Sequence, residues 1–411
     1  MPEGTGGGPP GPGEDAARAG APAPAAGARV LVALIVGQLG VHSTMAGVRL
    51  AAALQLLREG YSAWSVGLLL ALFAAAPVLL AMPAGRLADR HGYHRPVRLA
   101  ALLAIGGALC AVGATFVGGG WHFALLCAAA AATGTGANTG MLAIQRTAGL
   151  VARDATERVR IFSWMGIAPS FANVVGPVAV GFVIDGFGFA AAYLLMAALP
   201  LATLASARRV PHIAAPRAAR VPGRRAWDLL RTPGMARLLA VNWLLSMCWD
   251  VHLFAVPVLG HDRGFAAATI GLVLGTFTLS VTMVRLLIPL LAHRLDELKV
   301  LRGAMVGTAL VFAAYPLAPN AWTMGLCAAL LGVTLGSVQP MVMTMLHHLT
   351  PDQRHGEALA LRSMAINTSS TLMPLVFGAI GALAGAAVLF WAVGGAVGAG
   401  SWVARRLAPV R

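Results

Sequence analysis

Charged side chains are scarce in this sequence. Asp, Glu, Lys and Arg make up 11% of its 411 residues, whereas a typical soluble domain has about 25%. The mean hydropathy is correspondingly high, at +0.76, and apolar runs of about 20 residues recur along the chain. This composition excludes an ordinary water-soluble globular protein and indicates a chain that is surrounded mostly by lipid.

Cysteine is also scarce, and its placement excludes two further classes of protein. The four cysteines lie inside apolar runs without paired spacing, which argues against a disulfide framework and against a zinc site. No group of His, Asp and Glu has the spacing of metal ligands. The Gly-rich segment 134–140 lies inside an apolar run with no strand before it, so it is not a nucleotide-binding loop. We therefore expect no enzyme activity, no metal and no cofactor.

Lysine is almost absent: Lys299 is the single lysine, and the other basic residues are arginines. The net charge of +15 comes from 30 basic and 15 acidic residues, but the arginines are spread between apolar runs, which argues against nucleic-acid binding. Most of them fall on one side of a membrane. Only Arg49, Arg58 and Arg263 fall on the other side, and Arg285 lies within a run. The positive-inside rule therefore predicts a multi-pass protein of the bacterial inner membrane with both termini in the cytoplasm.

Twelve apolar runs account for most of the chain. Each is long enough to cross ~30 Å of hydrocarbon as a helix with a rise of ~1.5 Å per residue. The alternating pattern of membrane-barrel strands is absent, so we predict an all-α membrane protein with twelve transmembrane helices. The runs cover residues 30–52, 63–84, 97–117, 121–145, 160–184, 188–207, 236–258, 267–291, 300–318, 322–346, 359–383 and 386–404.

The sequence divides these helices into two bundles of six. A Pro- and Arg-rich stretch at 208–234 separates the sixth run from the seventh and is predicted to be a cytoplasmic linker. The first bundle is then 28–207 and the second 235–404. Residues 1–27 are rich in Pro, Gly and Ala and have no signal-peptide pattern, so they are predicted to be a disordered cytoplasmic tail. A second short tail follows at 405–411.

The two bundles also resemble each other in sequence. Segments 125–141 and 325–341, which belong to the fourth and tenth runs, align without gaps and share Cys127/Cys327 and Gly136/Gly336. Two parallel repeats of six helices are a known plan of membrane transporters.

A charged motif, "GRLADRHGYHR", lies between the second and third runs. It resembles the signature G-x-L-A-D-R-x-G-R-K of the major facilitator superfamily, and the resemblance extends over residues 28–405. In that family the motif latches the cytoplasmic ends of the two bundles together, which implies contacts with acids such as Asp154 or Glu157. A purely topological role of the arginines is the alternative. The latch residues implied by the resemblance are Gly85, Asp89, Arg90, Gly92 and Arg95. We expect Gly85 to let two helix backbones approach closely and Gly92 to adopt the positive φ of a turn.

A second motif, "NVVGPVAVGF", lies in the fifth run. Gly176, Pro177 and Gly181 resemble the antiporter motif of the family, although Val180 replaces one expected Gly. The resemblance implies export by exchange, and ordinary small-residue packing is the alternative. The fourth run lacks the buried Arg that drug exporters of the family often carry.

Polar residues inside the apolar runs are candidates for a transport cavity, because such residues are costly in lipid. In the family, helices 1, 4, 7 and 10 line this cavity. In the first and seventh runs the polar residues fall on one helical face, and Arg285 is a deep cation in the eighth run. The cavity candidates are Gln38, His42, Arg49, Asn138, Gln145, Asn242, Trp249, Asp250, Arg285 and Gln339.

Asp250 is the one acid that the pattern places well inside a helix. Loading a proton or a cationic substrate would change its charge and favour one cavity state, and His42 is a second candidate for a proton site. A structural acid paired with Arg49 or His42 is the alternative. Three roles are open for Arg285: an ion pair with Asp250, binding of an anionic substrate, or extension to the inner surface of the membrane. Trp249 either stacks on a ligand or packs in the core.

These observations together predict a secondary active transporter of a small organic molecule that works by alternating access, most simply as a proton-coupled exporter. The expected partners are the small-molecule substrate, protons and the lipid bilayer, and the expected state is a monomer. Proton-coupled uptake of a sugar or an organic acid remains an alternative, as does a facilitator-like membrane sensor that transports nothing.

Overall fold

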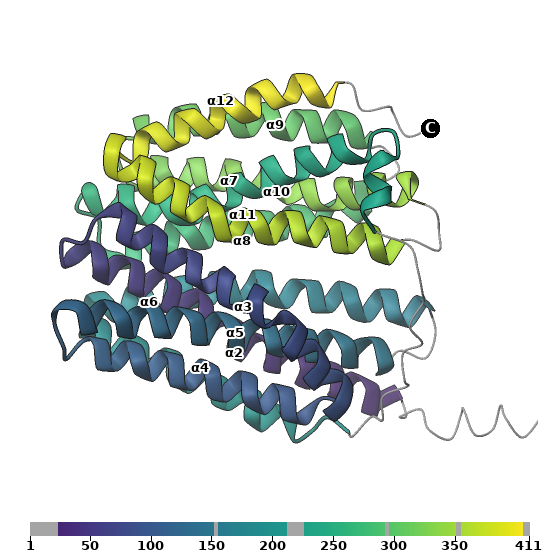
Figure 1. Ribbon diagram of the computed structural model, residues 1–411, viewed down its shortest axis with the longest axis horizontal. Helices are drawn as coiled ribbons and strands as arrows, with labels where there is room; N and C mark the ends of the chain where they lie inside the picture. The colour runs from purple at the N-terminus through teal and green to yellow at the C-terminus, as the bar shows by residue number, and fades with distance from the viewer. Residues whose placement is uncertain (1–23, 152–154, 212–225, 292–295, 351–354, 406–411) are drawn as a thin grey trace, which may run out of the picture.

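The computed structural model describes residues 24–151, 155–211, 226–291, 296–350 and 355–405. In this part of the chain every regular element is a helix (Figure 1). The helices are α2 (Pro24–Arg58), α3 (Ala63–His91), α4 (His94–Ala114), α5 (Gly119–Val151), α6 (Ala155–Ala207), η1 (Ala226–Arg231), α7 (Met235–Asp262), α8 (Ala267–Leu291), α9 (Glu297–Ala314), η3 (Tyr315–Leu317), α10 (Ala321–Leu349), α11 (His355–Ala384) and α12 (Ala386–Ala404).

Each of the twelve predicted spans falls on a helical segment, although the third runs past the end of α4 at Ala114 and the ninth includes the short 3-10 helix η3. The fifth and sixth spans are joined in α6, which kinks at Gly188, where φ is 81°. Within the described residues, nine helices are long and apolar enough to cross a membrane, and α12 is a shorter apolar helix. The helix α5 is not among the nine, because its Thr-, Gly- and Asn-containing stretch lowers its hydropathy. The predicted all-α membrane fold is confirmed.

Local sequence signals end and begin these helices. Gly92 ends α3 with a φ of 67° and donates its N–H to the Ala88 carbonyl at 3.0 Å, which confirms the expected positive φ. Asn320 begins α10 with a capping box that includes Thr323. Asp296 begins α9, and the backbone N–H of Lys299, 2.9 Å away, lowers the pKa of this carboxyl.

The helices form two groups that lie one above the other in Figure 1. In the first group α2 packs on α6 and α5, while α4 packs on α5 and α6. In the second group α8 and α9 pack on α10, and α7 packs on α11 and α12. The two groups meet mainly where α6 packs on α8 and where α3 packs on α11.

The start of α2 and the end of α12 lie at the same end of the molecule, on the right of Figure 1. We call this the inner end, because the charge pattern predicts that it faces the cytoplasm, and we call the opposite end the outer end. The helix α2 begins at Pro24, four residues earlier than the predicted start of the first bundle at residue 28. Proline is favoured in the first helical turn, so it does not stop the helix there.

Small residues bring the two groups into close contact near the outer end. A Cβ at Gly181 of α6 would lie 2.6 Å from the Ala267 carbonyl oxygen at the start of α8. A Cβ at Gly67 of α3 would overlap the Pro374 carbonyl and Gly378 of α11. Such close backbone approach is typical of glycine at helix contacts in membranes. The outer end is therefore closed in this conformation.

Candidate functional site

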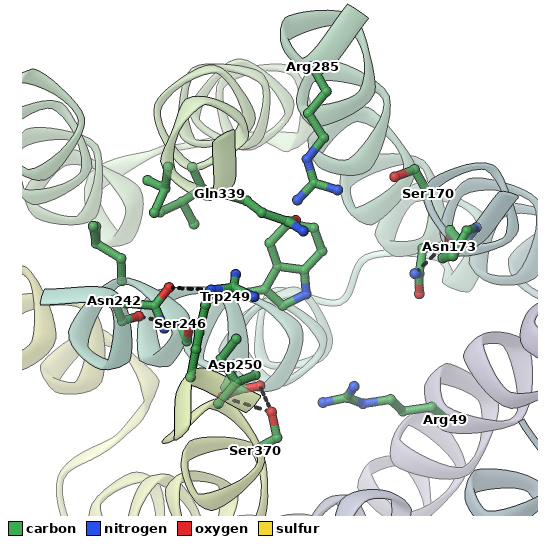
Figure 2. Close-up of a pocket in the computed structure, with 16 residues that line it drawn as sticks. Arg49, Ser170, Asn173, Asn242, Ser246, Trp249, Asp250, Arg285, Gln339 and Ser370 are labelled. Carbon is green, nitrogen blue, oxygen red and sulfur yellow. Dashed lines mark hydrogen bonds between the residues drawn. The ribbon is translucent and has the colours of Figure 1, made fainter. Parts of the chain in front are cut away.

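A cavity of about 330 Å³ lies between the two groups of helices (Figure 2). Its walls come from α2 and α6 of the first group and from α7, α8, α10 and α11 of the second. It is lined by Arg49, Pro169, Ser170, Asn173, Asn242, Leu245, Ser246, Trp249, Asp250, Arg285, Leu335, Val338, Gln339, Arg362, Ile366 and Ser370.

Asp250 of α7 is held by two hydroxyl groups of α11. Ser369 donates a hydrogen bond to one carboxylate oxygen at 2.9 Å, and Ser370 donates to the other at 3.1 Å. The residue is only 4% exposed. Arg49 of α2 extends toward it in Figure 2 and interacts with it electrostatically, although no direct ion pair joins them in the described structure. The carboxylate thus has bound donors and a facing cation.

Two further arginines make the cavity positively charged. Arg362 of α11 donates from Nε to the Asn242 side-chain oxygen at 3.3 Å. The buried Nε of Arg285, on α8, has no hydrogen-bond partner in the described part of the chain. Arg285 and Arg362 carry the same charge and line the same cavity. With Arg49 they make three cations against one acid, Asp250, among the lining residues.

Trp249 provides an aromatic surface inside this cavity. Its ring meets Phe277 edge-on, with centroids 4.7 Å apart and an interplanar angle of 67°. Figure 2 shows the side chains of Arg285 and Gln339 extending toward the indole. The ring packs on Phe277, which is one of the two roles that the sequence left open, and it also lines the cavity. Its stacking on a ligand stays a prediction. Aromatic and apolar side chains beside a few polar groups are typical of ligand pockets.

Six of the ten predicted cavity residues line this cavity, and four do not. Gln38 is buried away from it at 1% exposure. His42 reaches it only through Asn173, whose Nδ2 lies 3.4 Å from His42 Nε2. Asn138 and Gln145 of α5 are not among the lining residues. No α5 residue is among the lining residues, since this helix packs on α3 and α4. The helices α6 and α11 instead supply wall residues that the sequence did not predict. The residues that do line it are Arg49, Asn242, Trp249, Asp250, Arg285 and Gln339.

Sequence reasoning missed the contribution of α11. Arg362, Ile366, Ser369 and Ser370 follow the spacing i, i+4, i+7 and i+8, which places them on one helical face. The same spacing identified the polar face of α7. The polar face of α11 was therefore detectable, but Arg362 lies near a predicted helix end, where an arginine usually serves topology.

The outer end is held by a second polar cluster, which we call the outer latch. Asp185 of α6 accepts hydrogen bonds from the backbone N–H groups of Ala267 at 3.0 Å and Ala268 at 2.7 Å, the first two residues of α8. Arg58 of α2 lies 3.4 Å from the same carboxylate. A carboxylate at a helix N-terminus accepts hydrogen bonds from the free N–H groups there and interacts favourably with the positive end of the helix dipole. The latch therefore joins the two groups of helices.

The predicted helix 5 motif lies between this latch and the cavity. A Cβ at Gly176 would lie 2.6 Å from the Ser43 carbonyl oxygen of α2, so this residue packs inside the first group. Gly181 packs across the two groups, on α8. Pro177 lines a second pocket of only about 20 Å³, which shares Arg49 and Asn173 with the cavity. The motif thus contributes to closing the outer end, and its role in exchange stays a prediction.

The predicted inner latch is only partly described. A Cβ at Gly85 would meet no atom of the described structure within 4 Å, so the expected close helix contact at this glycine is wrong for this conformation. Arg90 and Arg95 are exposed. The side chains of Asp89 and Glu157 lie outside the described residues, as does Asp154.

Comparisons with known proteins agree with this geometry. The sequence model of the Major Facilitator Superfamily matches residues 31–249 and 238–411. The fold is similar to that of a point mutant of the nucleoside transporter NupG, with a TM-score of 0.76, 15% identity, and coverage of 92% of this chain and 99% of that one. It is also similar to a POT family transporter in complex with a thioalcohol-conjugated peptide, with a TM-score of 0.74 and 12% identity over 91% and 94% of the chains. A bacterial homologue of the human lysosomal transporter Spinster, in an inward-facing and occupied conformation, has a TM-score of 0.73 and 11% identity over 92% and 97%.

The matched segments cover the chain from the start of its first span to its last residue. The all-helical fold, the cavity between two groups of helices and the motif at residues 85–95 are the features that the resemblance implied. The chain belongs to the Major Facilitator Superfamily.

Proposed function

We propose that this protein is a proton-coupled secondary transporter that exports a small organic molecule across the bacterial inner membrane by alternating access. The observation that carries the proposal is Asp250, a buried acid in the cavity between the two groups of helices, with Arg49 facing it. In such a transporter the site is exposed to one side of the membrane at a time. Family and fold indicate transport rather than catalysis.

Asp250 is the group best placed to couple a proton to this cycle. As a carboxylate it accepts from Ser369 and Ser370 and faces Arg49. Taking up a proton removes the negative charge, so Arg49 of α2 loses its counter-charge and the contact of α2 with α7 weakens. A proton and a substrate that contacts these helices therefore bias the same conformational equilibrium, which is the requirement for coupling.

The export direction is supported by the helix 5 motif. Gly181 lies where α6 packs on α8, and Pro177 lines the small pocket that shares Arg49 with the cavity. Release to the outside requires this contact to separate. A motif placed there can set how readily the outer end opens.

The test is transport in bacteria that lack their major exporters. We expect cells expressing the protein to accumulate less of some toxic organic compounds, and we expect collapse of the proton gradient to remove the difference. Asp250→Asn should abolish this reduction in accumulation, because the amide cannot exchange a proton. The matched control is Asp262→Asn, which removes an exposed acid near the outer end of the same helix and should leave export unchanged.

Other outcomes would contradict the proposal in distinct ways. Higher accumulation of a compound, dependent on the proton gradient, would indicate uptake instead of export. Wild-type export in Asp250→Asn would remove this residue from coupling. No change in any compound, with the protein shown to be in the membrane, would favour a sensor that transports nothing.

A further inference from the structure

We propose that the substrate of this cavity is a small organic anion, with a carboxylate or phosphate group held by Arg285 and Arg362 and an apolar body placed against Trp249. This inference rests on the proposed transport function and names its substrate class. The sequence left the sign of this ligand open, because Asp250 suits a proton or a cation and Arg285 suits an anion.

The charges of the lining residues favour an anionic ligand. Asp250 is already satisfied by Ser369 and Ser370 and is faced by Arg49. Arg285 and Arg362 remain without an acidic partner in the described part of the chain. A cationic ligand would add positive charge to this excess, whereas an anion supplies the counter-charge that the cavity lacks.

The two guanidinium groups are placed to bind an anionic group of the ligand. Arg362 is oriented by its bond to Asn242, and Arg285 has a buried Nε with no partner in the described structure. Both residues line the same cavity, so we expect one anionic group to contact the two guanidinium groups together. Guanidinium groups bind carboxylates and phosphates through paired hydrogen bonds.

The remaining lining defines the body of the ligand. Trp249, Leu245, Leu335, Val338 and Ile366 are apolar and line the same cavity. The volume of about 330 Å³ lies at the lower end of the range for small-molecule sites. An anion with one compact apolar or aromatic body therefore fits better than a free inorganic ion or a large drug.

Binding to the purified protein tests the charge preference with compounds that share one body. One set is indole-3-acetate, indole-3-acetamide and tryptamine. The other is benzoate, phenyl phosphate, benzamide and benzylamine. We expect the acids to bind and the matched amides and amines not to bind. Arg285→Gln and Arg362→Gln should each weaken binding of the acids by roughly 10- to 100-fold. The matched control is Arg98→Gln, an exposed arginine of α4 outside the cavity, which should bind as wild type.

A measurement without ligand guards against variants that simply fold poorly. If Arg285 is an unpartnered cation beside Arg362, then Arg285→Gln should raise the thermal unfolding midpoint of the ligand-free protein. A lowered midpoint would show that the guanidinium is satisfied and would overturn the inference. Failure of every carboxylate and phosphate to bind at millimolar concentration would overturn it too.

The same compounds separate this inference from the transport function itself. Transport of the amides or amines, with the acids left behind, would overturn the anion preference and leave the transporter intact. Arginine-dependent binding of the acids without movement of any compound in proteoliposomes would overturn the proposed transport and leave the anion site.

Discussion

The outer latch gives a quantitative prediction about the conformational equilibrium. Asp185 accepts two backbone N–H groups at the start of α8 and pairs with Arg58. Replacing a carboxylate in a capping position by alanine costs about 0.5–2 kcal/mol. The Arg58 pair is partly exposed, so it adds at most about 1 kcal/mol. The variant Asp185→Ala should therefore destabilise the outer-closed state by roughly 1–2 kcal/mol.

This energy changes the population of the outer-open state. A change of about 1.4 kcal/mol is tenfold in an equilibrium constant, so the variant should shift the ratio by roughly 5- to 30-fold. Starting from a minor state of about 1%, the outer-open form would reach roughly 5–25%. That fraction is large enough to measure by distance methods, while the wild type should stay almost entirely closed.

The assay is a distance measurement between two spin labels at the outer end. Phe116→Cys and Leu383→Cys place them after α4 and near the end of α11, at positions that are 77% and 89% exposed, in a background without native cysteines. In Asp185→Ala we expect a second, longer distance. The control Asp262→Ala removes another acid from the outer end and should keep the wild-type distribution. An unchanged distribution in Asp185→Ala would refute the assignment of Asp185 as a latch.

Two further substitutions test the packing around this end. Gly181→Val places methyl groups against the Ala267 backbone, which should cost about 1–3 kcal/mol in the outer-closed state and lengthen the same spin-label distance. Gly186→Val, where a Cβ meets no atom of the described structure within 4 Å, is its control, and equal distances in the two variants would contradict the packing argument. Tyr193→Phe removes the donor that Gln55 accepts at 2.8 Å in the buried contact between α6 and α2, and an unpaired buried acceptor costs about 1–3 kcal/mol. Its thermal unfolding midpoint should fall below that of Tyr61→Phe, which loses only an exposed contact to the Gly119 carbonyl, and equal midpoints would show that the buried bond adds no stability.

Much of the fold follows from the sequence, because lipid imposes a simple rule. Backbone polar groups have no partners in hydrocarbon, so each apolar run of about 20 residues becomes a helix. The twelve predicted spans all fall on helical segments for this reason, apart from a few residues at the ends of the third and the ninth. Gly92 ended α3 as expected, since a positive φ can be inferred from the motif itself. The family could likewise be inferred from residues 85–95.

The cavity depends on helix rotation, which the sequence of one helix does not set. Gln38, His42 and Arg49 lie on one face of α2, yet only Arg49 lines the cavity. The helix is long and packs along α6, so polar residues near its inner part are covered while Arg49 meets the second group. The polar residues of α5 are directed elsewhere by its packing on α3 and α4.

The charge of the site was decided only by tertiary structure. The sequence identified Asp250 and Arg285 separately and left the sign of the ligand open. Packing of α11 beside α7 brings Ser369 and Ser370 onto Asp250 and places Arg362 on Asn242. Because these partners are more than 100 residues away in the chain, no local pattern could pair them. The apolar runs of the sequence are thus enough to predict the helices, whereas the balance of charge in the cavity depends on how those helices pack.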